Sequence, residues 1–327
     1  MSQFDRESLR SELAGLASNG VYIGTSSWKY EGWLGQVYDP ARYVYRSKFA
    51  RTRFERSCLT EYAEVFKTVC VDAAYYAFPS QKYLEGLSAQ VPEDFKFTFK
   101  VTDDITIKRF PNLARFGLKA AQSNPDFLNA DLFATAFLAP CSIIKAKIAV
   151  LIFEFSHFYA SDFAHGRDFV ESLDTFLGAL PKGWRYGVEM RNRRWLQPDY
   201  FAALHRHNVA HVFNNWTDMP SVAEQMVLPG SETSEFNAAR FLLKPGRTYE
   251  QAVSTFQPYR EVQEPNEEAR AAATKLVTDG VSKSTRRPTF IYVNNRLEGN
   301  SPSTIAAILA RLKAKRESTA EDGETPS

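Results

Sequence analysis

The chain has 327 residues, with 40 basic and 38 acidic side chains and a formal net charge of +2. This length exceeds the usual single domain but suits an α/β barrel that forms one unit, and the 44% hydrophobic share supplies a sizeable core. The balanced charge excludes a global field that would hold a polyanion, although a local basic patch is compatible with it.

The cysteine content and the N-terminal sequence predict a cytoplasmic protein. Cys58, Cys70 and Cys141 are odd in number and widely spaced, so they form neither a disulfide framework nor a CxxC metal motif. The first 20 residues carry charges throughout and lack the apolar core of a signal peptide. Because no apolar run approaches the roughly 20 residues of a membrane-spanning helix, we expect no membrane partner.

A lead-in helix is expected within residues 1–20, where apolar residues recur at helical spacing before Asn19-Gly20. Strand-like segments then alternate with helical ones. The expected strands are Val21–Thr25, Thr68–Ala73, Phe95–Val101, Lys147–Phe155, Arg185–Glu189, Val209–Phe213, Arg240–Lys244 and Thr289–Val293. The expected helices are Ser47–Val65, Gln81–Ala89, Gly166–Leu180, Asp199–His207, parts of 250–281, and Pro302–Lys315, with less regular helical segments at Leu113–Ala121 and Phe127–Leu138.

Eight strands separated by helices predict an α/β protein whose parallel strands close into a barrel. We expect a single (β/α)8 TIM-barrel-type domain over residues 21–315, with an insertion near its C-terminal end. The segment 316–327 has almost no apolar residues and is expected to be a disordered tail.

Polar residues follow the apolar strands, and in such a barrel the C-terminal strand ends converge on the functional site. The most informative stretch is Arg185–Trp195 (RYGVEMRNRRW), where a short strand delivers a carboxylate and then several guanidinium groups. The candidate catalytic residues are Glu189, Asp72 and Glu154. The candidate substrate-binding residues are Ser27, Trp28, Tyr76, Lys100, Arg191, Trp195, Asn215, Lys244, Asn294 and Asn295.

Two interpretations of the carboxylates stay open at this point. Glu154 and Glu189 could divide the roles of acid and base if their surroundings shift their pKa values apart. A buried charge survives only when it is paired, so Glu189 could equally be the structural ion-pair partner of Lys100 or of an arginine.

Motifs for cofactors are missing from the sequence. The glycines at 24, 32 and 35 do not form GxGxxG, and the five histidines include no HExxH pattern. No P-loop, GxSxG or cysteine–histidine nucleophile signature is present. The cofactor is therefore unknown, and no metal site is assigned.

Several motifs carry a family resemblance that extends from Tyr22 to about Leu312. They are Gly24-Thr25-Ser26-Ser27-Trp28, the W-x-G-x-x-Y-x-P run 33–40, Phe66–Pro79, Pro92–Lys100, the group Val188, Glu189, Arg191 and Trp195, and the pair Asn294-Asn295. Together they resemble the DUF72 (YecE-like) family of uncharacterised TIM-barrel-type proteins. The resemblance implies the barrel fold but no established reaction.

The chain departs from that family pattern at three of its strands. Cys70 stands where the pattern has Glu, Ile107 stands where it has His, and Glu154 replaces a Gln. The resemblance therefore implies a divergent member, in which chemistry that depends on the missing Glu and His is altered.

Three functions are weighed. The leading one is an enzyme-like barrel, of hydrolase or isomerase type, that binds a small polar ligand, sugar-like or anionic, at its C-terminal mouth. The second is a nucleic-acid-processing barrel of phosphodiesterase or endonuclease type, suggested by basic clusters at 42–56 and 191–194 but disfavoured by the few histidines. The third is a non-catalytic binding protein, suggested by Cys70, Ile107 and Ser156.

Overall fold

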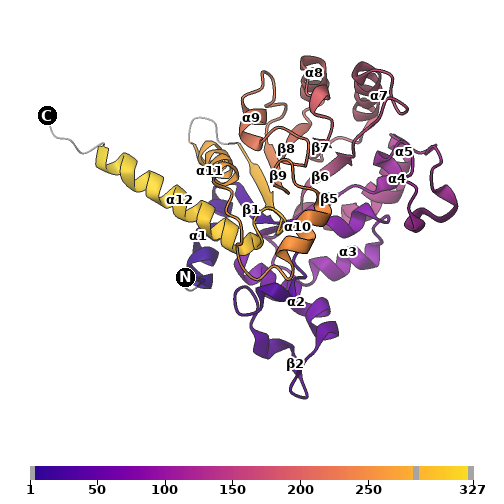
Figure 1. Ribbon diagram of the computed structural model, residues 1–327. Coiled ribbons are helices and arrows are strands. Elements are labelled where there is room, and N and C mark those ends of the chain that lie inside the picture. Colours follow the sequence, from indigo (N-terminus) through magenta and orange to yellow (C-terminus); the bar gives the residue numbers. More distant parts are fainter. Residues whose placement is uncertain (1–3, 283–286, 323–327) are drawn as a thin grey trace.

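The computed structural model describes residues 4–282 and 287–322, in which eight parallel strands close into a barrel in chain order (Figure 1). The strands are β1 (Val21–Thr25), β4 (Thr68–Val71), β5 (Lys96–Lys100), β6 (Ile148–Phe155), β7 (Tyr186–Met190), β8 (Ala210–Asn214), β9 (Asn237–Phe241) and β10 (Thr289–Val293). The predicted (β/α)8 TIM-barrel-type fold is thus confirmed.

Helices surround the barrel on its outside (Figure 1). The longer ones are α1 (Arg6–Ser18), α2 (Arg51–Val65), α3 (Gln81–Ser88), α7 (Gly166–Ala179), α8 (Pro198–Arg206), α10 (Tyr249–Phe256), α11 (Glu267–Val281) and α12 (Ser301–Asp322). Shorter ones are α4 (Asp103–Thr106), α5 (Ala130–Leu132), α6 (Ala139–Cys141) and α9 (Val222–Met226). Within the described ranges, no helix combines the length and the apolar character that crossing a membrane requires.

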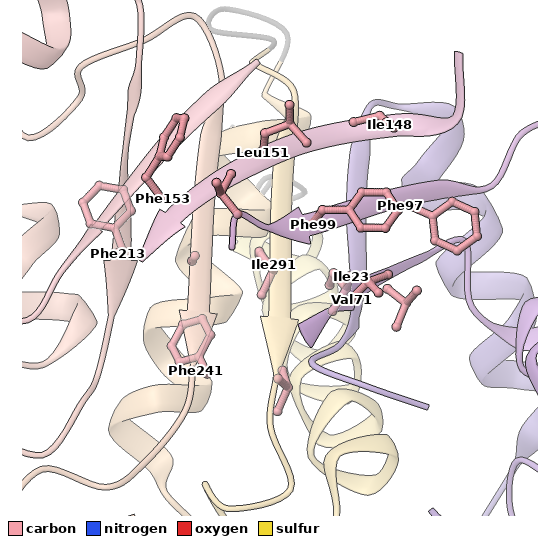
Figure 2. Packing of buried hydrophobic residues seen from close by; sticks show 14 of the residues in the cluster. Ile23, Val71, Phe97, Phe99, Ile148, Leu151, Phe153, Phe213, Phe241 and Ile291 are labelled. Carbon is pink, nitrogen blue, oxygen red and sulfur yellow. The ribbon is translucent and has the colours of Figure 1, made fainter. Parts of the chain in front are cut away.

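The alternation of side chains along each strand separates two cores. One face of the strands packs outward against the helices, as Figure 2 shows for Ile23, Val71, Phe97, Phe99, Ile148, Leu151, Phe153, Phe213, Phe241 and Ile291. The other face fills the barrel interior, through residues that include Val150, Ile152, Val212, Ala238 and Tyr292. The next inward-facing positions toward the C-terminal ends carry the charged residues described below.

The seam between β1 and β4 is the weakest joint of the barrel, with the single backbone pair Thr25↔Val69. The hydroxyl of Tyr62, from α2, lies in this seam, where it accepts from Thr25 N at 3.1 Å and donates to Thr68 O at 2.9 Å. Gly24 allows the close approach, because a Cβ at this position would lie 2.1 Å from Thr68 O. A side chain of the outer layer therefore completes the ladder.

The predicted bounds of the seventh strand, Arg240–Lys244, are wrong: β9 runs from Asn237 to Phe241, three residues earlier in the chain. The apolar run Phe-Leu-Leu suggested the later position. In the fold, however, Leu242 N donates to the side chain of Asn215 and Leu243 N to its carbonyl, so the backbone leaves the ladder after Phe241. Arg240 consequently lies inside the barrel near the C-terminal end of its strand.

The segment Ser47–Val65 is helical only from Arg51, because the residues before it form a hairpin of β2 (Val44–Tyr45) and β3 (Lys48–Phe49). Its turn residues Arg46 and Ser47 both have positive φ values, of 49° and 61°, as a type I′ turn requires. This hairpin was not predicted. It projects from the body of the molecule at the lower edge of Figure 1.

The segments expected to be helical between 113 and 138 are less regular than the pattern indicated. Residues Ala114–Lys119 form 3-10 turns interrupted at Gly117, whose φ is 51°. Residues Phe133–Leu138 are π-helical, just before Pro140, which has no N–H to continue an α-helical ladder.

The C-terminal part of the chain holds two further differences. The polar segment expected to be helical over 250–281 consists of α10 and α11, separated by residues 257–266, in the long connection between β9 and β10. The last helix, expected to end at Lys315, continues to Asp322, so the first part of the predicted tail is helical. Residues 323–327 lie outside the described residues.

Candidate functional site

Six charged side chains meet inside the C-terminal end of the barrel. Three are carboxylates, Asp72, Glu154 and Glu189, and three are cations, Lys100, Arg191 and Arg240. We call these six residues the ion network. Its charges balance, which is the condition under which charge is tolerated in a barrel interior.

Glu154 and Glu189 lie directly opposite each other on neighbouring strands, where like charges repel. Two guanidinium groups bridge this pair. Arg191 Nη2 lies 2.7 Å from Glu154 Oε2 and 2.9 Å from Glu189 Oε1, while Arg240 Nη1 lies 2.9 Å from Glu154 Oε2 and 2.6 Å from Glu189 Oε2. The two arginines thus offset the repulsion between the carboxylates, and the carboxylates in turn hold both guanidinium groups in place.

The network is more open on one side than on the other. The side chain of Glu189 is fully buried, with both oxygens accepting from guanidinium groups, which is the environment of an ion-pair partner. Asp72, at the end of β4, is bound to Arg240 at 3.1 Å and leaves 32% of its side chain exposed. Asp72 is therefore the carboxylate that a ligand from solvent can reach most easily.

Electrostatics keep Glu154 and Arg240 ionised. Burial alone would raise the pKa of Glu154, but Arg191, Lys100 and Arg240 together hold it well below its usual value. Burial would likewise lower the pKa of Arg240, yet Glu189 and its neighbours raise it well above the ordinary arginine value. Glu154 is therefore a carboxylate at neutral pH, which has no proton to donate and is a weak acceptor of one.

Aromatic rings position two of the three cations without neutralising them. Lys100 Nζ, whose other partner is Glu154 at 2.7 Å, lies 3.9 Å from the centre of the Tyr75 ring. The guanidinium carbon of Arg191 lies 3.8 Å from the centre of the Trp216 ring. Cation–π contacts of this kind fix a cation while leaving its charge available to an anion.

Arg240, which joins all three carboxylates, is the site residue that the sequence pattern missed. The pattern places it at the start of an expected strand, far from the C-terminal end. The alternation within β9, where Ala238 and Arg240 share one face and Ala239 and Phe241 the other, is the signal that places it inward. Lys244, predicted in its place, is an exposed loop residue outside the network.

Three predicted asparagines hold loop backbone. Asn215 Oδ1 accepts from Leu242 N at 2.6 Å, and Asn294 Oδ1 accepts from Arg296 N at 3.0 Å. Asn295 Oδ1 accepts from the backbone N–H and the hydroxyl of Ser301, both at 2.8 Å. These side chains shape the loops at the mouth of the barrel, and their amide oxygens are already engaged.

The predicted aromatic residues separate in the fold. Trp195 stacks on Phe158 and Phe169 in the outer layer, and Trp28, which follows the half-buried Ser27, lies over a cavity between α2 and α3. Tyr76 is 63% exposed beside Tyr75, with the Arg115 guanidinium over its ring. Tyr76 adjoins the ion network through Tyr75, whose ring contacts Lys100.

A cavity of about 500 Å³ opens beside the ion network, at the C-terminal face of the barrel. Tyr75 forms part of its wall and separates it from Lys100, whose ammonium group lies on the same ring. The rest of the wall comes from the loops that follow β5 and β6. We call it the mouth cavity; its charged lining residues are Lys108, Arg109, Arg115, Asp162 and, when protonated, His157.

Metal ligands do not gather in this part of the molecule. Over residues 4–282 and 287–322, no three His, Cys, Asp or Glu side chains come together in an arrangement that could hold a metal ion. Cys70, inside the barrel below the network, is a neutral thiol, because burial raises its pKa to about 12.

Comparison with known proteins agrees with the fold. A family model described as "Protein of unknown function DUF72" matches residues 22–327. A DUF72 family protein of Enterococcus faecalis has a similar structure, with a TM-score of 0.60 and 17% sequence identity over 90% of this chain and 95% of its own. A DUF72 family protein of Thermotoga maritima gives a TM-score of 0.53 and 19% identity over 91% and 99% of the two chains. No curated protein matches the chain.

Proposed function

This chain belongs to the DUF72 family, and because that family is described only as of unknown function, we propose a role from the chemistry of the barrel mouth itself. We propose that the protein binds a small anionic molecule, such as a sugar phosphate, in the mouth cavity. The observation that carries this proposal is a cavity of about 500 Å³ beside the ion network, whose lining includes three cations and four aromatic rings.

The lining favours an anion over a neutral sugar. Lys108 lies between the rings of Phe127 and Phe163, at 5.2 and 4.6 Å from their centres, and it has no carboxylate partner among the residues that the structure describes. Arg109 donates to Ala121 O and is otherwise exposed. These two cations face a single acidic side chain of the lining, Asp162, which already accepts from the Tyr159 amide.

In the proposed site the ion network would position cations next to the cavity without lining it. In this proposal Glu154 and Glu189 hold Lys100 and Arg191 in place, and the ring of Tyr75, which forms part of the cavity wall, packs against the non-ionic part of the ligand. Asp72 is the carboxylate with the most solvent access, so the acid–base role is assigned to Asp72 in place of Glu189. The reaction would then be of hydrolase or isomerase type on the bound anion.

A non-catalytic binding role is the second candidate. It is favoured because both carboxylate oxygens of Glu189 are already bound to arginines. If the network only holds the cations in place, ligand binding would still depend on those cations, but turnover would be absent. The two roles differ at Asp72. In an enzyme, Asp72→Asn abolishes turnover and leaves binding intact, whereas a binding protein shows no turnover before or after the change.

A ligand titration tests the proposal directly. Thermal unfolding would be followed with glucose 6-phosphate, inorganic phosphate and glucose, each at the same concentration. A ligand at 100 times its Kd stabilises the native state by about 2.7 kcal/mol, so we expect a clear rise in melting temperature with the phosphates and none with glucose.

The matched variants are Arg109→Gln and Lys119→Gln. Both remove one positive charge from the same loop region, but Lys119 pairs with Asp104 and does not line the cavity. We expect Arg109→Gln to weaken the response to phosphate and Lys119→Gln to leave it unchanged. A wild-type protein that responds to neither phosphate nor sugar phosphate, or equal loss in both variants, contradicts the proposal.

A further inference from the structure

The hairpin β2–β3 and the first turns of α2, residues 42–56, form a surface that the barrel mouth does not use. We call this segment the basic hairpin. It contains six cationic side chains and one carboxylate, although the whole chain has a net charge of only +2. The excess positive charge of the protein is therefore concentrated in fifteen residues, and the rest of the chain is slightly acidic.

Ion pairs neutralise only part of this charge. Arg42 is bound to Glu61 and Glu64, and Arg51 to Glu31 and Glu55. Within the described part of the chain, the other four cations of the segment have no carboxylate within salt-bridge distance; they are Arg46, Lys48, Arg53 and Arg56. Unpaired cations on one projecting element form an electrostatic footprint for a polyanion.

Aromatic and apolar side chains stand exposed among these cations. Tyr45 is 56% exposed, Val44 43% and Phe49 39%. Tyr45 pairs across the hairpin with Lys48, and the Arg46 guanidinium lies 5.2 Å from the centre of the Tyr45 ring. An accessible ring flanked by two cations combines a stacking platform with phosphate-binding charges.

The charges and the exposed rings of the basic hairpin favour some classes of partner over others. A second copy of this chain is disfavoured, because two such segments repel each other. An anionic membrane is disfavoured because the tip of the hairpin is the polar turn Arg46-Ser47, whereas the apolar Val44 and Phe49 form the strand pair farther from it. An acidic peptide satisfies the charges but offers no flat faces to Tyr45.

We propose that the basic hairpin is a docking arm for single-stranded nucleic acid, with phosphates on Arg46, Lys48 and their neighbours and a base stacked on Tyr45. Unpaired bases are needed, because the faces of bases within a duplex are already stacked. This surface is separate from the mouth cavity, so it neither requires nor excludes the small-anion site.

Fluorescence anisotropy with labelled 15-nucleotide oligo(dT) and oligo(U) tests the proposal. We expect binding at about 50 mM salt, with log K falling by about 0.7 per phosphate contact for each unit of log salt, or about 3 for four cations. Arg46→Gln combined with Lys48→Gln should reduce that slope by about half. Tyr45→Ala should weaken binding roughly tenfold through the lost stacking.

Matched variants locate the binding surface. Tyr76 is as exposed as Tyr45, and within the described residues Arg109, like Lys48, has no carboxylate partner. Arg109 lines the mouth cavity, however, and Tyr76 adjoins the wall residue Tyr75. Tyr76→Ala and Arg109→Gln should leave the oligonucleotide affinity unchanged. Because every substituted side chain is at the surface, equal melting temperatures of all variants would show that folding is intact.

Several outcomes would overturn this inference. One is the absence of any anisotropy change at 50 mM salt. Another is loss of affinity in Arg109→Gln but not in the hairpin variants, which would place the polyanion at the mouth. A third is equal binding of polyglutamate with no effect of Tyr45→Ala, which would assign the arm to acidic polypeptides. Binding to phosphatidylserine vesicles without oligonucleotide binding would assign it to membranes.

Discussion

Arg240 organises the interior of the barrel mouth, because its guanidinium group contacts Asp72, Glu154 and Glu189 while its side chain is only 2% exposed. Two residues at which the chain departs from the family pattern lie close to Arg240. Where the pattern has Glu at 70 and Gln at 154, this chain has Cys70 and Glu154, and both face Arg240. Glu154 lies 2.9 Å from Arg240, so the carboxylate at position 154 is one of the three that balance the three cations of the network.

The residue-scale prediction concerns Glu189→Gln. This substitution keeps the size of the side chain but leaves Arg191 and Arg240 with one carboxylate fewer in a buried site. We expect the free energy of unfolding to fall by about 3–5 kcal/mol, the usual cost of removing one member of a buried ion pair. Urea denaturation measures it.

The control is Glu232→Gln, which removes an exposed ion pair with Arg287. Exposed pairs contribute roughly 0–1 kcal/mol, so this variant should stay close to the wild type. If Glu189→Gln unfolds at the same urea concentration as the wild type but abolishes turnover, Glu189 acts on the substrate and the supporting role assigned to it is wrong.

At the scale of elements, the joint between β1 and β4 depends on α2. The other strands of the barrel share two or more paired positions with each neighbour, but β1 and β4 share only Thr25↔Val69. The Tyr62 hydroxyl accepts from Thr25 N and donates to Thr68 O, which makes it a bridge between the two strand edges. The barrel closes through a helix side chain.

Tyr62→Phe tests this joint. The substitution preserves the ring, which stacks on Phe66, but leaves a buried N–H and a buried carbonyl without their partner. Each unsatisfied group costs about 1–3 kcal/mol, so we expect a clear loss of stability in chemical denaturation. Tyr159→Phe, at a tyrosine that is 67% exposed, is the control and should change little. Equal stability of both variants would mean that the seam closes without the hydroxyl.

At the scale of the whole molecule, one buried histidine makes stability depend on pH. His211 on β8 lies between the Tyr200 hydroxyl and the Gln225 amide, and burial lowers its pKa to about 4 from an ordinary 6.5. Because the unfolded chain binds the proton more readily, the neutral ring stabilises the fold above pH 6.5, and this contribution is lost as the pH falls from 6.5 toward 4.

We therefore expect the free energy of unfolding to decline by up to about 3 kcal/mol between pH 7 and pH 4. Below pH 4.5 a second decline should follow, because the pKa of Glu154 is lowered by its cations and its contribution is lost as it gains a proton. Urea denaturation across this range measures both. His211→Gln should flatten the first decline, whereas the exposed His205→Gln should not; an unchanged slope in His211→Gln would contradict this assignment.

The sequence by itself determined the barrel, because hydrophobic alternation is a local property and eight apolar strands separated by helices admit few topologies. It also placed five of the six network residues at strand ends, since a charge next to an apolar run is visible in one dimension. Only the tertiary structure decided that Arg240 points inward and that Lys244 does not. Asn215, which directly follows β8, ends β9 by accepting from the Leu242 amide, and no local pattern reports a bond between residues 27 positions apart. The tertiary structure also decided that both oxygens of Glu189 are bound by arginines and where the mouth cavity lies, because both depend on which strand ends and loops meet when the barrel closes.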